Sequence, residues 1–147
     1  MDNNEDEEIV ESLIDDLHTV NLLICILNQL PKGCILTLTD YIYSAFADGW
    51  LLKLKDYMSI DGVYYLFELS QDCIHYIEKE LLSSPEFIHY FCHYAIRRGN
   101  QRLLRVYDET IFVIDPSLNI PASLINSCEE HEIYVYREVI TKDYFES

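Results

Sequence analysis

The stretch His93–Glu109, HYAIRRGNQRLLRVYDE, holds four of the ten basic residues of a 147-residue chain whose formal net charge is −16. Its glycine, Gly99, stands between two segments rich in apolar residues. We interpret the stretch as a helix–turn–helix unit, because Ala95 allows close packing and glycine readily takes the left-handed conformation that ends a helix. The apolar positions beyond the glycine would then fold a second helix back onto the first.

The segment around Gly49, SAFADGWLLKLKDYM, repeats this spacing. Ala45 lies four residues before Gly49, the same distance as in the first segment. Two weaker repeats of this spacing follow if Asp72 and His131 take the position of the glycine, although a side chain is strained in a left-handed turn. The spacing predicts an all-α fold in which antiparallel helix pairs stack within a single helical domain, residues 1–147.

An amphipathic helix is expected ahead of these pairs. Its apolar residues recur at steps of three and four from Val10 to Leu27, and Pro31–Gly33 ends it. Residues 1–8 are expected to form a flexible acidic lead-in and residues 141–147 a loose tail. The segments CIHYIEKELL, ASLINSC and IYVYREVI are also predicted to be helical, whereas TIFVIDPSLNIP is rich in β-branched residues and suits an extended chain.

Composition narrows the classes of function. Four glycines and four prolines favour helices over a turn-rich sandwich. Acidic residues outnumber basic ones by 26 to 10, which argues against nucleic acid or an anionic membrane and suits a basic partner surface. The five cysteines are odd in number and lack a CxxC pair, so we expect reduced thiols and a cytosolic setting. The start of the chain does not read as a secretory signal, and no apolar stretch reads as a membrane-spanning helix.

Two groups of histidine and cysteine residues have the spacing of zinc ligands. His89, Cys92 and His93 would share one helix face, and Cys128 and His131 form a second pair. No nucleophile turn and no glycine-rich phosphate loop accompanies them. We therefore expect a protein that is not an enzyme and needs no cofactor or metal. The alternative is a small metal-binding or catalytic protein built on these five residues.

The arginines are the candidate binding residues. Arg98, Arg102 and Arg105 would form one stripe on the second helix of the unit, with Arg97 beside the turn. A solvated outer face with local ion pairs is the favoured interpretation, a protein-contact surface is the second and a nucleic-acid site the third. Trp50, just past the Gly49 turn, is the next candidate for partner binding.

The repeated segment resembles an ankyrin repeat. His93-Tyr94-Ala95 matches the H-x-A of the motif T-P-L-H-x-A, and Gly99-Asn100 matches the turn before its second helix. The chain is similar to the degenerate ankyrin-type multigene-family proteins of African swine fever virus. That resemblance implies a virulence or host-range factor in the host cytoplasm, which suppresses interferon or NF-κB signalling by binding a host signalling protein. A second resemblance, of LTDYIYSAFADGWLLKLKDYMSIDG to the small Bcl-2-like poxvirus proteins, implies the same kind of function.

Overall fold

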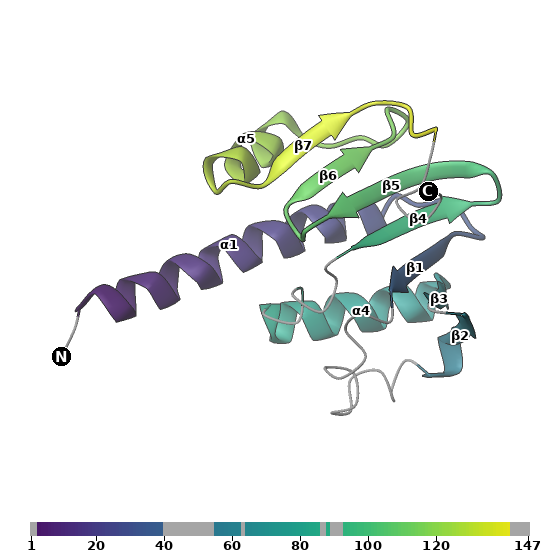
Figure 1. Ribbon diagram of the computed structural model, residues 1–147, viewed down its shortest axis with the longest axis horizontal. Coiled ribbons are helices and arrows are strands. Elements are labelled where there is room, and N and C mark those ends of the chain that lie inside the picture. Colours follow the sequence, from purple (N-terminus) through teal and green to yellow (C-terminus); the bar gives the residue numbers. More distant parts are fainter. Residues whose placement is uncertain (1–2, 40–54, 63, 86–87, 89–92, 142–147) are drawn as a thin grey trace.

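The computed structural model describes residues 3–39, 55–62, 64–85, 88 and 93–141. In these residues the chain forms three α-helices and a seven-stranded mixed sheet, which is an α/β fold (Figure 1). The prediction of an all-α fold is therefore wrong, and so is the ankyrin-like stacking of helix pairs. No helix in the described ranges is long and apolar enough to cross a membrane.

The helices and strands alternate irregularly along the chain. In order they are α1 (Asn3–Leu27), β1 (Ile35–Thr39), the short 3-10 helix η2 (Lys55–Tyr57), β2 (Met58–Asp61), β3 (Tyr64–Glu68), α4 (Gln71–Ser83), β4 (Tyr94–Arg98), β5 (Gln101–Tyr107), β6 (Ile111–Ile114), α5 (Ala122–Glu130) and β7 (Tyr134–Arg137). Across the sheet the order is β2-β3-β1-β4-β5-β6-β7. Neighbouring strands are antiparallel except for β6 and β7, which are parallel and joined through α5.

The three helices cover one face of the sheet. In Figure 1, α1 runs between α5 above it and α4 below it, and its N-terminal half extends beyond the sheet. One cluster of buried apolar side chains joins this helix layer to alternate residues of the strands. These alternate residues are Leu36, Leu38, Tyr65, Phe67, Tyr94, Ile96, Leu104, Val106, Phe112 and Ile114, and Leu103 joins them next to Leu104. Because side chains alternate along a strand, the residues between them face the opposite, helix-free side.

The stretch His93–Glu109 is a β-hairpin rather than two helices. Strands β4 and β5 pair antiparallel, and Arg98 lies opposite Gln101 across a two-residue turn. Gly99 has a φ of +57° and Asn100 a negative φ, which is the pattern of a type II′ turn with glycine first. Gly99 therefore does take the left-handed region, but it joins two strands.

The hairpin contains a β-bulge that obscures the strand pattern in the sequence. Ile96 pairs with Leu104, whereas the next residue, Arg97, pairs with Arg102, so Leu103 is an extra residue on β5. Leu103 and Leu104 are both buried in the core. Two consecutive leucines on one side break the alternation of a strand, and this is why the spacing resembled that of a helix.

The three helices themselves agree with the sequence patterns. Helix α1 ends at Leu27, ahead of Pro31–Gly33, and Gly33 has a φ of +87°. It begins at Asn3, so the helix includes residues 3–8, which the sequence assigned to a flexible lead-in. Helix α4 has Ser70 as its N-cap, whose side chain accepts a hydrogen bond from the backbone N–H of Cys73. By contrast, the predicted helix IYVYREVI contains strand β7.

Candidate functional site

Three of the four candidate arginines share the helix-free face of the sheet. Arg97 and Arg102 lie directly opposite each other on β4 and β5, and Arg105 lies opposite Ala95. Arg98, one residue along from Arg97, is on the other side of β4. The helical stripe expected from Arg98, Arg102 and Arg105 is therefore replaced by a sheet cluster of Arg97, Arg102 and Arg105.

Burial and packing distinguish these arginines. Arg97 is exposed, whereas Arg102 and Arg105 are half-buried. The guanidinium carbon of Arg105 lies 4.8 Å from the centre of the Tyr107 ring, within the range of a cation–π contact. The arginines therefore lie on a β-hairpin, with Arg105 packed on an aromatic ring, and the helical hairpin of the favoured interpretation is wrong.

Other predicted site residues lie outside the described part of the chain. Gly49 and Trp50 are among them, and so are His89 and Cys92. His93 is described: its Nδ1 accepts a hydrogen bond from the backbone N–H of Asp108 at 3.2 Å. Its Nε2 lies 3.4 Å from Oδ1 of the same aspartate. This histidine therefore holds the turn between β5 and β6.

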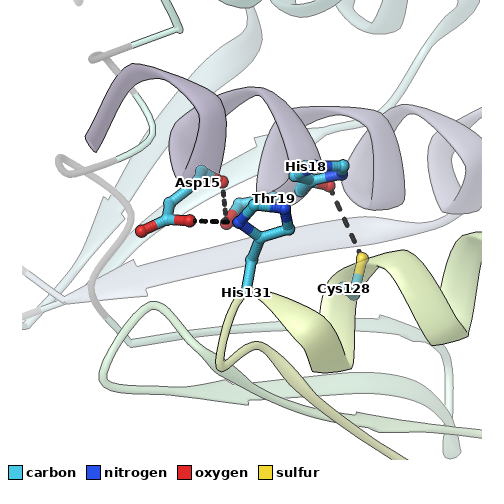
Figure 2. Close-up of polar contacts among 5 residues, drawn as sticks. All are labelled: Asp15, His18, Thr19, Cys128 and His131. Carbon is cyan, nitrogen blue, oxygen red and sulfur yellow. Dashed lines mark hydrogen bonds and ion pairs between the residues drawn. The ribbon is translucent and has the colours of Figure 1, made fainter. Parts of the chain in front are cut away.

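A polar seam joins α1 to the end of α5 (Figure 2). Nδ1 of His131 lies 2.8 Å from Oδ1 of Asp15, and the His131 ring stacks on that of His18 with centroids 4.2 Å apart. The hydroxyl of Thr19 donates to the backbone carbonyl of Asp15, and the thiol of Cys128 lies 3.8 Å from the carbonyl oxygen of His18. The seam connects two helices that are more than a hundred residues apart in sequence.

The chemistry of the seam is that of a structural contact. Cys128 is fully buried, and burial together with the charge of Glu129 raises the pKa of its thiol to about 11. A thiol with such a pKa carries little thiolate at neutral pH, and the thiolate is the form that attacks substrates or binds metal. Within the described ranges, no three histidine, cysteine, aspartate or glutamate side chains are grouped so that they could hold a metal ion.

The open edge of the sheet at β7 was not among the sites predicted from the sequence. The backbone N–H of Tyr134 donates to Thr110 at 2.8 Å, and that of Glu138 donates to Ile114 at 3.2 Å. In a parallel pair such bonds come from alternate residues, so the N–H and C=O groups of Val135 and Arg137 point away from β6. No described strand pairs with that outer side.

Exposed aromatic side chains lie next to this edge. Tyr134 and Tyr136 lie on the helix-free face, 45% and 52% exposed, and Val139 just beyond the strand is 70% exposed. Val135 packs against the core on the other face. The alternation Tyr-Val-Tyr, with its aromatic and β-branched residues, is the signal that could have identified a strand here.

The surroundings of β7 are acidic. From Ile111 to Thr141 the sequence holds five acidic residues against one arginine. Exposed glutamates stand around the strand at positions Glu129, Glu130, Glu132 and Glu138. At its start lies a cavity of about 360 Å³, whose lining includes Tyr134 and the carboxylates of Asp15, Asp16, Glu109 and Glu132.

Comparisons with known proteins identify no relative. No protein-family model matches the chain, and no curated protein or solved structure matches it significantly.

Proposed function

We propose that this chain is a non-enzymatic protein that acts by binding a protein partner through the β7 end of its sheet. The observation that carries the proposal is the open edge of β7, with Tyr134 and Tyr136 exposed side by side on the helix-free face. Tyrosine combines a large apolar surface with a polar hydroxyl and is enriched at protein interfaces. A partner that binds here would bury exposed aromatic side chains and form hydrogen bonds with backbone groups that no described strand pairs.

Burial of the described thiols favours binding over thiol catalysis. Cys34, Cys73 and Cys128 are buried, and burial raises the pKa of each. In the polar seam, the stack on the His18 ring and the carboxylate of Asp15 hold the His131 side chain against α1. These groups stabilise the fold in the arrangement that the structure gives them.

Suppression of host innate signalling is the narrower form of this proposal. It was implied by the ankyrin resemblance, whose best-matched segment is the β4–β5 hairpin. The support that remains is general: an acidic chain with an exposed interaction edge suits a basic partner surface. An interferon or NF-κB reporter in transfected cells tests it, and an unchanged reporter at full expression contradicts it.

Site-specific photo-crosslinking tests the binding proposal. A benzoyl-phenylalanine at position 136 should crosslink a partner in transfected cells, while the same residue at Ile60, an exposed position on the opposite edge strand β2, should not. The double change Tyr134→Ala and Tyr136→Ala should abolish capture by a probe at position 139 and leave the melting temperature nearly unchanged. Equal crosslinking from positions 136 and 60 would contradict a binding surface at β7.

A further inference from the structure

The outer edge of β7 offers backbone groups as well as side chains. Val135 and Arg137 each direct one N–H and one C=O away from β6, so an added strand could form up to four hydrogen bonds with β7. Strand addition at an exposed sheet edge is a general mode of peptide recognition, in which the main chain supplies the bonds and alternate side chains supply specificity.

The positive charge of Arg137, which could deter another strand from pairing with β7, is held by hydrogen bonds to a neighbouring loop. Natural edge strands often carry charged side chains that deter pairing with another strand. In β7 the guanidinium of Arg137 donates to the backbone carbonyls of Pro116 and Leu118, in the loop between β6 and α5. Arg137 is exposed, but these bonds hold its guanidinium against the loop. The other exposed charged residues described around the strand are glutamates.

We propose that β7 binds an extended, basic segment of a partner protein, which adds to the sheet as an eighth strand. This inference rests on the proposed function and specifies the chemistry of the partner. Lysine or arginine side chains of the added strand would lie near Glu129, Glu130, Glu132 and Glu138, and near the acidic cavity at the start of β7. Apolar residues at the alternate positions would pack beside Tyr134 and Tyr136.

A second copy of this chain fits the same edge poorly. Pairing two β7 strands would bring the two glutamate-rich surroundings together, and each chain carries a net charge of −16. Like charges placed opposite each other oppose association. Charge complementarity therefore selects a basic occupant.

Amide hydrogen exchange can test the orientation of the edge before any ligand is added. The amides of Tyr134, Tyr136 and Glu138 should exchange at least tenfold more slowly than those of Val135 and Arg137, because only the first three donate within the sheet. Equal protection of all five amides would contradict an open edge and overturn the proposal.

The ligand test uses a synthetic ten-residue peptide in which lysine alternates with valine or threonine. Binding should slow the exchange of the Val135 and Arg137 amides at least tenfold and leave the other three unchanged. A peptide with glutamate in place of lysine should bind at least tenfold more weakly. N-methylation of the alternate peptide amides that face β7 should abolish binding, whereas methylation of the other set should not. Equal binding of the lysine and glutamate peptides would overturn the basic character of the partner.

Failure of this proposal can be told apart from failure of the proposed function. If the lysine peptide shifts the tyrosine signals without protecting Val135 and Arg137, strand addition is wrong while binding at β7 stands. If no peptide binds but position 136 still crosslinks a partner in cells, the partner's chemistry is wrong. In the chain, Glu130→Gln with Glu138→Gln should weaken binding of the lysine peptide several-fold. Glu68→Gln with Asp72→Asn, which changes two exposed carboxylates on β3 and α4, provides the matched control.

Discussion

Strands β5 and β7 belong to one sheet but differ in how many of their backbone groups pair with neighbouring strands. β5 pairs on both sides, with β4 and β6, and its residues Leu103, Leu104 and Val106 are fully buried. Among the described strands β7 pairs only with β6, and none of its four residues is buried. A central strand stabilises the fold with all its backbone groups, whereas an edge strand keeps half of them available for a partner. Stability and binding are thus expected to separate along this sheet.

The largest expected effect contrasts Phe112 on β6 with Tyr136 on β7. Phe112 is fully buried and packs edge-to-face on Tyr94, with ring centroids 6.4 Å apart. Phe112→Ala should lower the free energy of unfolding by about 3–5 kcal/mol, because it leaves a cavity in the core. Tyr136→Ala should cost less than about 1 kcal/mol. Urea denaturation measures both, and similar losses would mean that β7 is as much part of the core as β6.

The cysteines allow the buried core and the accessible surface to be compared by their rates of alkylation. Burial raises the pKa of Cys73 to about 12 and that of Cys128 to about 11, from an ordinary value of 9. Two units correspond to about a hundredfold less thiolate, so Cys128 should react with iodoacetamide at pH 8 at least that much more slowly than in the unfolded chain. Cys25, which is only half-buried, should be alkylated before either.

These thiols also predict a pH dependence of stability. Their pKa values are higher in the folded than in the unfolded chain, so above pH 9 the unfolded state loses protons first. The free energy of unfolding should therefore fall as the pH rises from 9 to about 11 for Cys128 and to about 12 for Cys73, and it should be insensitive to these groups below pH 9. Denaturation curves of the Cys73→Ala and Cys128→Ala variants give the reference, since each should lose part of this alkaline decline.

Substitution of Gly99, in the turn between β4 and β5, should destabilise the fold more than substitution of an exposed residue beside it. Gly99 has a φ of +57° and open space around it, so the cost of a side chain there is backbone strain alone. Gly99→Val should destabilise the fold by about 1–3 kcal/mol. Asn100→Val, in the same turn but with a negative φ, should cost less. Equal melting temperatures for the two variants would contradict the type II′ turn.

The sequence patterns predicted the helices because burial repeats every three or four residues there. In α4 the buried side chains are Cys73, Ile74, Ile77 and Leu81, all on one face. The strands were missed for two local reasons. The bulge at Leu103 places two adjacent leucines in the core, and the pair Gly99-Asn100, a known two-residue hairpin signal, was interpreted as the end of a helix.

The candidate site was harder to predict because it depends on long-range pairing. Tyr134, Val135 and Tyr136 have strand-like character, but no local pattern indicates that β7 joins β6 in parallel and becomes the last strand. The arginine cluster likewise requires the hairpin and its bulge, which bring Arg97 opposite Arg102. A binding site at a sheet edge depends on which strand is last in the sheet. The local patterns of a single sequence do not give that strand order.

The smallest expected effect concerns the turn that leads into the edge strand. Helix α5 ends with the hydrogen bonds of a Schellman motif: the N–H of Ile133 donates to Cys128 at 2.9 Å and that of Glu132 donates to Glu129 at 3.1 Å. The left-handed residue of this motif is Glu132, with a φ of +61°, one position after the histidine that the repeat suggested. A glutamate there is strained where glycine would not be.

Glu132→Gly should therefore stabilise the fold by about 0.5–1 kcal/mol, while Glu130→Gly in the last turn of α5 should destabilise it by a similar amount. The two variants remove the same charge from the same region, so their difference isolates the backbone conformation. Thermal denaturation of both variants measures this difference in stability. A lower melting temperature in both variants would contradict the left-handed turn. Because Ile133 is buried directly after this residue, relief of the strain should make the start of β7 more rigid. The amides of Tyr134 and Tyr136 should then exchange more slowly while those of Val135 and Arg137 stay fast, since a firmer entry into β7 does not close its outer edge.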